Sequence, residues 1–271
     1  MSHRFLTFLS DFGLADDFVG ACHGVIKRIA PEAEIVDITH GIEATQVLQG
    51  ALVLANTLPF MPEGVHLAVV DPGVGSDRRA VALRAGDGRL YVGPDNGLLV
   101  PAAERLGGVE GAWELENPAY RLEPVSPTFH GRDIFAPAAA YLASGLDPNE
   151  LGPALEPAAL VRLDVPSPVT GDGFIKAHVV IVDRFGNVQL NLTAEHLTGA
   201  GIDPGTQVEV EIGLQRFYAS AARTFADVRP GDIVLYEDAY GNIALAINVG
   251  NAAEMLATRP GDAVGITIRR R

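Results

Sequence analysis

Aspartate, arginine and histidine side chains stand at the ends of apolar runs or beside them at three places in this sequence. Asp71 ends the apolar run 65–70, and a turn of Pro, Gly, Val and Gly leads from it towards Arg78. Asp11 ends a similar run, and His130 stands just before a helix-like segment. In open α/β sheets, ligands bind in the crevice outside the carboxyl ends of the strands. Either aspartate alone could simply cap a turn, but the set together predicts a ligand site.

The elements that must position these residues alternate between strand-like and helix-like patterns up to about residue 145. Short apolar runs bounded by turn residues alternate with segments of helical periodicity. Such alternation predicts βαβ units on a mostly parallel sheet. We expect strands over 5–9, 34–38 and 65–70, helices over 19–30, 45–58 and 134–144, and an appended antiparallel hairpin, 80–84 with 89–92.

Beyond a stretch rich in Pro, Gly and acidic residues, the pattern changes to short strands only. The boundary is placed near Ser167, which gives an α/β domain over 1–166 and a smaller all-β domain over 167–271. Short strands separated by turns predict a small barrel or sandwich. The strand candidates are 174–182, 187–192, 208–212, 233–236, 243–248 and 263–268.

Composition limits the class of partner. The net charge is −14 and the pI is near 4.8, which argues against a nucleic-acid partner because phosphate binding needs a basic face. Cys22 is the only cysteine, so neither an intrachain disulfide nor a thiolate zinc site is expected. The first apolar run is too short for a signal peptide, and no run approaches the ~20 residues of a membrane span. We therefore expect a cytoplasmic protein without a membrane partner.

Sequence motifs for cofactors and metals are weak or missing. Gly73 and Gly75 begin a dinucleotide fingerprint, but Arg78 stands where its last glycine should be. Neither a P-loop nor a G-x-S-x-G motif is present. The histidines show no H-x-H or H-E-x-x-H spacing, so no metal site is predicted. The scattered histidines are interpreted as structural or exposed: His23, His40, His66, His178 and His196.

Several sequence blocks occur together in the order of one known family. They are S-D-F-G-L-A-D-D-F-V-G, V-D-I-T-H, V-D-P-G-V-G, G-P-D-N-G-L-L, T-F-H-G-R-D, D-R-F-G-N-V and Y-G-N-I-A-L-A-I-N. Over essentially the whole chain, the sequence resembles the SAM hydroxide adenosyltransferase family. These are S-adenosyl-L-methionine (SAM) hydrolases that share a fold with fluorinase and chlorinase enzymes. The resemblance implies hydrolysis of SAM to adenosine and L-methionine, without a cofactor, by a homotrimer whose sites lie between neighbouring subunits.

The resemblance also implies roles around the reacting carbon. Asp71, Arg78 and His130 match the family's Asp-Arg-His triad, and only this match chooses Arg78 over Arg79. Attack at ribose C5′ expels methionine as a neutral thioether, so the leaving group needs no general acid. The site must hold a water or hydroxide in line with the C5′–S bond. Arg78 can stabilise hydroxide, His130 can orient it or carry its proton, and Asp71 can orient the arginine or accept a hydrogen bond.

Two similar segments in the second domain contain side chains that could bind adenine. D-R-F-G-N-V-Q-L-N-L from Asp183 matches D-A-Y-G-N-I-A-L-A-I from Asp238, and both are predicted hairpins with Gly-Asn turns. Phe185 or Tyr240 would offer an aromatic face, and Asn187 an amide donor and acceptor, to an adenine edge. In the family the base binds in this domain, which favours binding by the Asp183 turn.

Asp11 and Phe225 complete the predicted substrate-binding residues. Asp11, at the end of a strand, is expected to accept both ribose hydroxyls. Phe225, in R-T-F-A-D-V, matches a family position that packs on the adenine, and ordinary core is its alternative role.

Related enzymes use a halide as nucleophile, and the resemblance favours water here. In those halogenases a serine occupies the Gly131 position, the His130 position is not histidine, and the aspartate found here at Asp71 is missing. An anionic Asp71 would repel chloride or fluoride by about 1 kcal/mol even in water at ~4 Å. The short connection 85–88 also leaves no room for the long insertion of the fluorinase.

Two other classes of function remain compatible with the sequence. Asp11, Asp71, Asp95 and His130 could ligate a divalent metal in a phosphohydrolase, because acidic residues at strand ends also build such sites. Sensitivity to chelators would distinguish that class. A sensor of SAM or adenosine would bind the same ligand and leave it intact.

Overall fold

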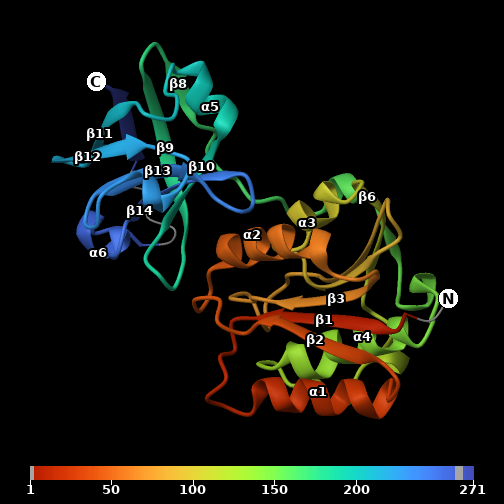
Figure 1. Cartoon of the computed structure of the whole chain (residues 1–271). Helices are drawn as coiled ribbons and strands as arrows, with labels where there is room; N and C mark the ends of the chain where they lie inside the picture. Colours follow the sequence, from red (N-terminus) through yellow and green to blue (C-terminus); the bar gives the residue numbers. More distant parts are fainter. Residues whose placement is uncertain (1–2, 260–264) are drawn as a thin grey trace. The chain divides into compact units, whose positions relative to one another are not determined.

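The computed structural model describes residues 3–259 and 265–271, and the chain divides into two compact units (Figure 1). The units are Met1–Leu163 and Asp164–Arg271, whereas the sequence pattern placed the boundary between residues 166 and 167. Among the described helices, none combines the length and the apolar character that crossing a bilayer requires.

The first unit contains a seven-stranded sheet in the order β2-β1-β3-β5-β4-β6-β7. Its strands are β1 (Phe5–Ser10), β2 (Glu34–Thr39), β3 (Gly64–Val69), β4 (Ala80–Ala85), β5 (Leu90–Pro94), β6 (Val109–Glu114) and β7 (Ala154–Leu155). The neighbours β2, β1, β3 and β5 are mutually parallel, which confirms the predicted α/β sheet. The strands β4, β6 and β7 extend it through antiparallel pairs.

Helices cover both faces of this sheet (Figure 1). They are α1 (Phe18–Ile29), α2 (Val47–Thr57), α3 (Val100–Arg105) and α4 (Ala136–Ala143). α1 and α4 share one buried core with the sheet, and α2 and α3 share another. α1 buries Val19, Cys22 and Ile26, whose spacing of three and four residues places them on one side of a helix.

The predicted hairpin is confirmed as β4 and β5, and its placement matters for the loop before it. β5 pairs in parallel with β3, and β4 pairs with β5 in the antiparallel sense. β4 therefore begins at the end of the sheet at which β3 ends, the carboxyl end of the parallel strands. The loop that joins β3 to β4 stays at that carboxyl end.

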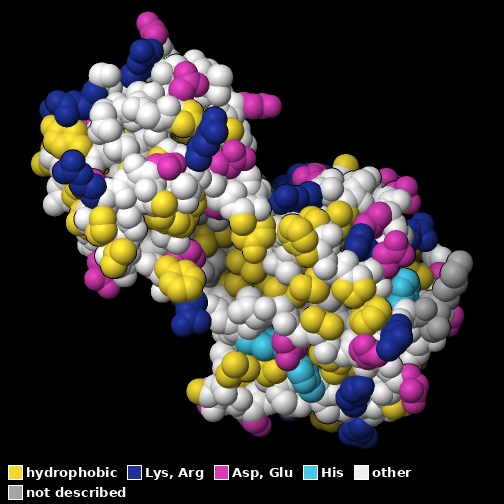
Figure 2. All heavy atoms as spheres, viewed as in Figure 1, with side chains coloured by type: hydrophobic (Ala, Val, Ile, Leu, Met, Phe, Trp, Pro, Cys, Tyr) yellow, Lys and Arg dark blue, Asp and Glu magenta, His cyan; other side chains and the backbone are white. Residues whose placement is uncertain are grey.

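α2 is apolar on its outer side as well as its inner side. Its inward residues include buried Ala51 and Leu54, while Leu48, Leu52 and Val53 are only partly buried. Hydrophobic side chains gather on the surface over this helix (Figure 2). A helix that is hydrophobic all round is normally covered on every side.

Short single-turn helices complete the first unit. They are η1 (Leu58–Phe60), η2 (Pro118–Tyr120), η4 (Pro148–Glu150), η5 (Pro157–Ala159) and the π-helical turn η3 (Gly131–Phe135). The helix expected over 134–144 thus begins in a π-helical turn and continues as α4.

The second unit is a closed β-barrel. Its eight strands lie in the order β10-β14-β13-β12-β11-β15-β9-β8, and a further pairing of β10 with β9 closes the sheet. The strands are β8 (Val169–Gly171), β9 (Phe174–Val182), β10 (Val188–Thr193), β11 (Gln207–Ile212), β12 (Gln215–Ala221), β13 (Ile233–Glu237), β14 (Asn242–Ile247) and β15 (Gly265–Arg270). This confirms the predicted all-β unit and selects a barrel.

Alternation places one face of each strand inside the barrel. In β11 the buried Val208, Val210 and Ile212 alternate with Glu209 and Glu211. Short helices lie between strands: α5 (Ala194–Gly199), η6 (Phe225–Asp227) and α6 (Ala252–Leu256). Of the strand predicted over 263–268, residues 263 and 264 lie outside the described residues, and the remainder belongs to β15.

Candidate active site

Two aspartates come together because they follow neighbouring parallel strands. β1 and β3 pair in register up to Ser10 and Val69, so the residues that follow emerge at the same sheet edge. Asp11 is the first of these after β1, and its backbone N–H donates to the carbonyl of Val69 at 3.4 Å. Asp71 follows β3 two residues after its end.

Arg78 joins Asp71 and His130 into one group, which we call the triad. Its Nε donates to Asp71 Oδ1 at 2.9 Å and to Oδ2 at 3.1 Å, and its Nη2 also contacts Oδ2. The same Nη2 donates to His130 Nδ1 at 2.8 Å. The guanidinium also lies over the ring of Phe135, 5.1 Å from its centre. Because the Arg78 and Asp71 side chains are only 10% and 6% exposed, water screens this pairing little.

The loop between the strands is folded so that Arg78 turns back onto Asp71. The carbonyl of Asp71 accepts from Val74 N at 3.2 Å, and the Ser76 hydroxyl donates to the Gly73 carbonyl at 2.6 Å. Gly75 has a φ of +77°, and a Cβ there would lie 2.6 Å from the carbonyl oxygen of Pro127. Only glycine fits both conditions without strain.

Arg79 points to a different partner, which separates it from Arg78. Its Nε donates to Asp95 Oδ2 at 2.9 Å, and its Nη2 donates to the Ala159 carbonyl. The other oxygen of the buried Asp95 accepts the backbone N–H of Val161 at 2.9 Å. Asp95 is thus engaged in fastening a loop, and it does not belong to the triad.

His130 stands at the start of the π-helical turn, and a buried carboxylate fixes that turn. Asp133 is 1% exposed and accepts from Arg132 Nε at 2.6 Å and from the backbone N–H of Ser126 at 2.8 Å. Burial alone would raise the pKa of Asp133, but these hydrogen bonds hold it below its usual value. Sequence reasoning missed this positioning role, although Asp133 lies within the quoted T-F-H-G-R-D block.

The surroundings of His130 favour its neutral form. Burial lowers its pKa, the positive charge of Arg78 lowers it further, and Asp71 and Asp133 oppose the change. Because Nδ1 faces an N–H of Arg78, that nitrogen must accept a hydrogen bond. In the neutral ring the proton therefore sits on Nε2.

Asp11, Asp71 and His130 line one small cavity of about 90 Å³. Thr45, also in its wall, donates its backbone N–H to Asp11 Oδ2 at 2.9 Å. Thr45 has a φ of +69°, an uncommon conformation for a residue with a Cβ. The orientation of the Asp11 carboxylate thus depends on a strained backbone. The cavity also brings the predicted ribose-binding residue next to two members of the triad.

In the second unit, the two predicted Gly-Asn hairpins are confirmed, and their turns have the same internal hydrogen bonds. Asp183 Oδ1 accepts from the backbone N–H groups of Phe185 and Asn187 at 2.8 and 2.9 Å. Asp238 Oδ1 accepts from Tyr240 and Asn242 at the same two distances. The carboxylate at the start of each turn therefore sets its shape.

The two turns differ in the side chains that they expose to solvent. Asp183 Oδ2 accepts the side-chain amide of Asn187 at 2.7 Å, so the amide is held in one orientation. Phe185 and Tyr240 are 68% and 46% exposed, and the guanidinium of Arg184 lies 5.6 Å from the Phe185 ring centre. An aromatic face and an oriented amide are thus available at the Asp183 turn.

Phe225 is partly exposed, and its ring contacts another aromatic ring of the second unit. It is 37% exposed and packs against Tyr236 with ring centres 4.8 Å apart. Burial, with the nearby Asp183 and Asp238, raises the pKa of Tyr236 to about 12, so its hydroxyl stays neutral. A separate cavity of about 480 Å³ lies between α5 and the barrel and includes Tyr236, but not the predicted adenine-binding residues.

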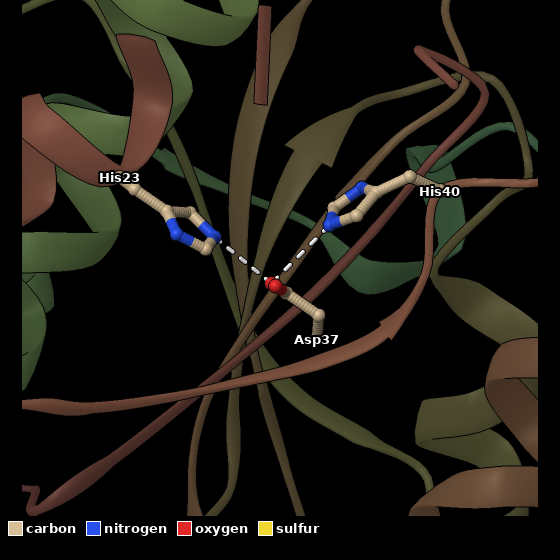
Figure 3. A group of neighbouring side chains, drawn as sticks. All are labelled: His23, Asp37 and His40. Atoms are coloured by element: carbon tan, nitrogen blue, oxygen red, sulfur yellow. Dashed lines mark hydrogen bonds and ion pairs between the residues drawn. The ribbon is translucent and has the colours of Figure 1, made fainter. Parts of the chain in front are cut away.

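The fold also assembles a group that the sequence did not predict. Among the described residues, one set of His, Cys, Asp or Glu side chains brings its ligand atoms within 4.8 Å of one another, and it consists of His23, Asp37 and His40 (Figure 3). The metal-dependent alternative named different residues, Asp11, Asp71, Asp95 and His130, and in the described part of the chain these form no such set. His23 and His40 lie on separate elements, so no short sequence spacing revealed them.

Comparison with known proteins agrees with this architecture. The family models for the N-terminal and C-terminal domains of SAM hydroxide adenosyltransferase match residues 6–152 and 177–265. A protein of Salinispora arenicola named (R)-S-adenosyl-L-methionine hydrolase is 50% identical over 98% of both chains. A fluorinase of an Actinoplanes species is 33% identical over 97% of both chains.

A solved structure extends the agreement to three dimensions. The crystal structure of an uncharacterized conserved protein from Thermotoga maritima superposes with a TM-score of 0.90 at 38% identity, covering 98% of this chain and all of that one. The two family models together match most of this chain, one in each unit. The chain therefore belongs to the SAM hydroxide adenosyltransferase family.

Proposed function

We propose that this protein hydrolyses SAM to adenosine and L-methionine. The observation that carries the proposal is the shared guanidinium of Arg78, which contacts both Asp71 and His130 beside the Asp11 cavity. Relatives that are up to 50% identical over nearly the whole chain bear the name of this activity. Their name specifies the (R) form of SAM, which we take as the substrate.

The reaction needs a positioned water more than it needs an acid. The oxygen of water forms a bond to ribose C5′ as the C5′–S bond breaks, and the electron pair of that bond neutralises the sulfonium. Methionine leaves as a neutral thioether, and one proton of the water must be lost. The protein therefore has to orient the water, favour its anionic form and accept a proton.

The hydrogen bonds of the triad support the following division of these tasks. Arg78 supplies a fixed positive charge that stabilises developing hydroxide. Neutral His130 accepts from Arg78 at Nδ1, so its Nε2–H donates to the water oxygen and orients it. Arg78 cannot accept a proton and Nε2 already carries one, so within the triad we assign proton acceptance to the Asp71 carboxylate.

The residues near the triad also favour water over a halide. The carboxylate of Asp71 opposes an anion in the same place. A Cβ at Gly131 would lie 2.8 Å from the ring of Phe12, so the wall has no spare volume for the serine found in related halogenases. Phe12 in turn packs against Phe18 and Phe129, which restricts its movement.

Two alternatives are less well supported. A phosphohydrolase site would need Asp95 as a ligand, but that side chain is occupied by Arg79 and by the backbone of Val161. A sensor without turnover would not need a basic group held between a carboxylate and an imidazole. Relatives named as hydrolases further favour turnover.

The first test is the identity of the products. Incubation of chelator-treated protein with (R)-SAM in ¹⁸O-labelled water is expected to give methionine and adenosine with the label on the 5′ oxygen, measured by mass spectrometry. High chloride should give no 5′-chloro-5′-deoxyadenosine, and EDTA should leave the rate unchanged because the triad itself activates the water. Methylthioadenosine as product, or a strict need for added metal, would contradict the proposal.

The second test separates chemistry from binding. His130→Ala and Arg78→Ala should each lower turnover by about 10²–10³-fold, since their partner is the nucleophile. Both should still bind adenosine, whereas Asp11→Ala should weaken adenosine binding by roughly 10-fold because the ribose hydroxyls lose their acceptor. Calorimetry with adenosine measures this difference, and an equal loss of affinity in all three variants is the contrary result.

The third test concerns the charge state of His130. Its ring should gain a proton only below the ordinary histidine pKa of 6.5, because burial and Arg78 disfavour the cation. Arg78→Gln should raise this midpoint, and Asp71→Asn should lower it further. NMR titration of the His130 ring, assigned with a His130→Gln sample, provides the measurement. A midpoint above 6.5, or one that neither variant moves, is incompatible with the neutral state assigned to His130.

We further propose a homotrimer in which the triad of one copy and the Asp183 turn of a neighbour complete one site. The two groups of residues belong to separate compact units, and the apolar outer side of α2 suits contact with another copy. Light scattering should give the mass of three chains, and Leu52→Glu on α2 should lower both that mass and the activity. Full activity of a monomer would rule this assembly out.

A cytoplasmic location stays a prediction.

A further inference from the structure

Two histidines converge on one carboxylate oxygen at the edge of the first unit's sheet. His23 lies on α1, Asp37 on the edge strand β2, and His40 directly beyond the end of β2. His23 Nε2 is 2.9 Å from Asp37 Oδ1, and His40 Nε2 is 3.2 Å from the same oxygen (Figure 3). We call these three residues the His-Asp-His cluster.

The hydrogen bonding inside the cluster is incomplete. His40 is 4% exposed, and its buried Nε2 approaches Asp37 Oδ1 to 3.2 Å, an ion-pair distance, without the alignment of a good hydrogen bond. A buried ring nitrogen with no partner costs about 1–3 kcal/mol, and a poorly aligned contact recovers only part of that cost. A group that occupied the space between the three side chains would remove this cost.

The spacing of the three atoms suits a metal ion. Zinc binds histidine nitrogen and carboxylate oxygen at about 2.0–2.2 Å, so two ligand atoms of a tetrahedral site lie roughly 3.3–3.5 Å apart. The measured N–O separations in the cluster are 2.9 and 3.2 Å, and all three ligand atoms lie within 4.8 Å of one another. Small side-chain movements would therefore suffice.

The outer surroundings of His40 also resemble those of a metal ligand. Its Nδ1 lies 2.7 Å from the hydroxyl of Ser10, and its ring packs against Phe8 with centres 4.7 Å apart. Metal-bound histidines commonly donate their other ring N–H to a nearby oxygen, which fixes the ring and leaves the ligating nitrogen free. Ser10 plays that part here.

The open side of the cluster allows an ion to enter. The side chains of His23 and Asp37 are 32% and 40% exposed, whereas that of His40 is 2% exposed. Water can therefore complete the coordination from the solvent side. Two nitrogens and one carboxylate oxygen suit zinc and similar transition ions, whereas calcium and magnesium prefer oxygen ligands alone.

We propose that His23, Asp37 and His40 form a binding site for one divalent transition-metal ion, best filled by zinc. The site is not made of triad residues, and the proposal does not rest on SAM hydrolysis. A bound ion links α1 to β2. Through His40 and Ser10 it also stiffens the end of β1, directly before Asp11.

Calorimetry on the untagged full chain, stripped of metal with a chelator and then dialysed, tests this site. Zinc chloride should bind at one ion per chain, and calcium chloride should not bind. His23→Ala removes a ligand and Asp37→Asn removes the negative charge of another, so each should weaken zinc binding at least ~10-fold. His3→Ala, a histidine of the same unit outside the cluster, is the matched control and should bind as the wild type does.

A second readout guards against misfolded variants. Far-ultraviolet circular dichroism should be unchanged in the variants, and zinc should raise the melting temperature of the wild type and of His3→Ala but not of the cluster variants. Cobalt should give visible absorption bands that require His23. Failure of the wild type to bind zinc stoichiometrically, or undiminished binding in both cluster variants, would overturn the proposal.

Discussion

The candidate active site depends on the Arg78 guanidinium and its contacts with Asp71 and His130. The Arg78 side chain is only 10% exposed, Asp71 balances its charge, and Nη2, which contacts Asp71, also donates to His130. Removing one partner of a buried ion pair typically costs about 3–5 kcal/mol, because the other charge is left uncompensated. The contact with Arg78 also fixes the tautomer of His130, and the charge of Arg78 adds to burial in lowering the pKa of this histidine.

The parallel half of the sheet explains why such a group can exist at all. β1 and β3 end in register, so two aspartates from distant parts of the chain reach one edge without any long side chain. The histidine comes from a different segment, at the start of a π-helical turn fastened by Asp133. Three independent backbone anchors thus surround a cavity of about 90 Å³.

Much of this arrangement could be predicted from sequence, because it depends on local signals. Apolar runs that stop at aspartate marked β1 and β3, and the repeated Gly-Asn turns marked two hairpins of the barrel. The strand β12 was not predicted, since it opens with Gln215 and Arg216 and shows little apolar alternation. The His-Asp-His cluster was missed for a different reason, because tertiary packing of α1 against the sheet joins residues that share no short spacing. Likewise, residue type alone does not separate Arg78 from Arg79: the family match chose Arg78, and the fold gives each arginine its own carboxylate.

The reversed direction of β4 has a consequence for the order in which the site assembles. Since β4 starts where β3 ends, Asp71 and Arg78 are only seven residues apart along the chain, whereas Arg78 and His130 are separated by 52. Closing the longer loop costs roughly 2 kcal/mol more in chain entropy, by the logarithmic dependence on loop length. The carboxylate and the guanidinium therefore form a nearly autonomous local unit. The contact of His130 with Arg78, in contrast, can form only when the sheet and α4 have packed together.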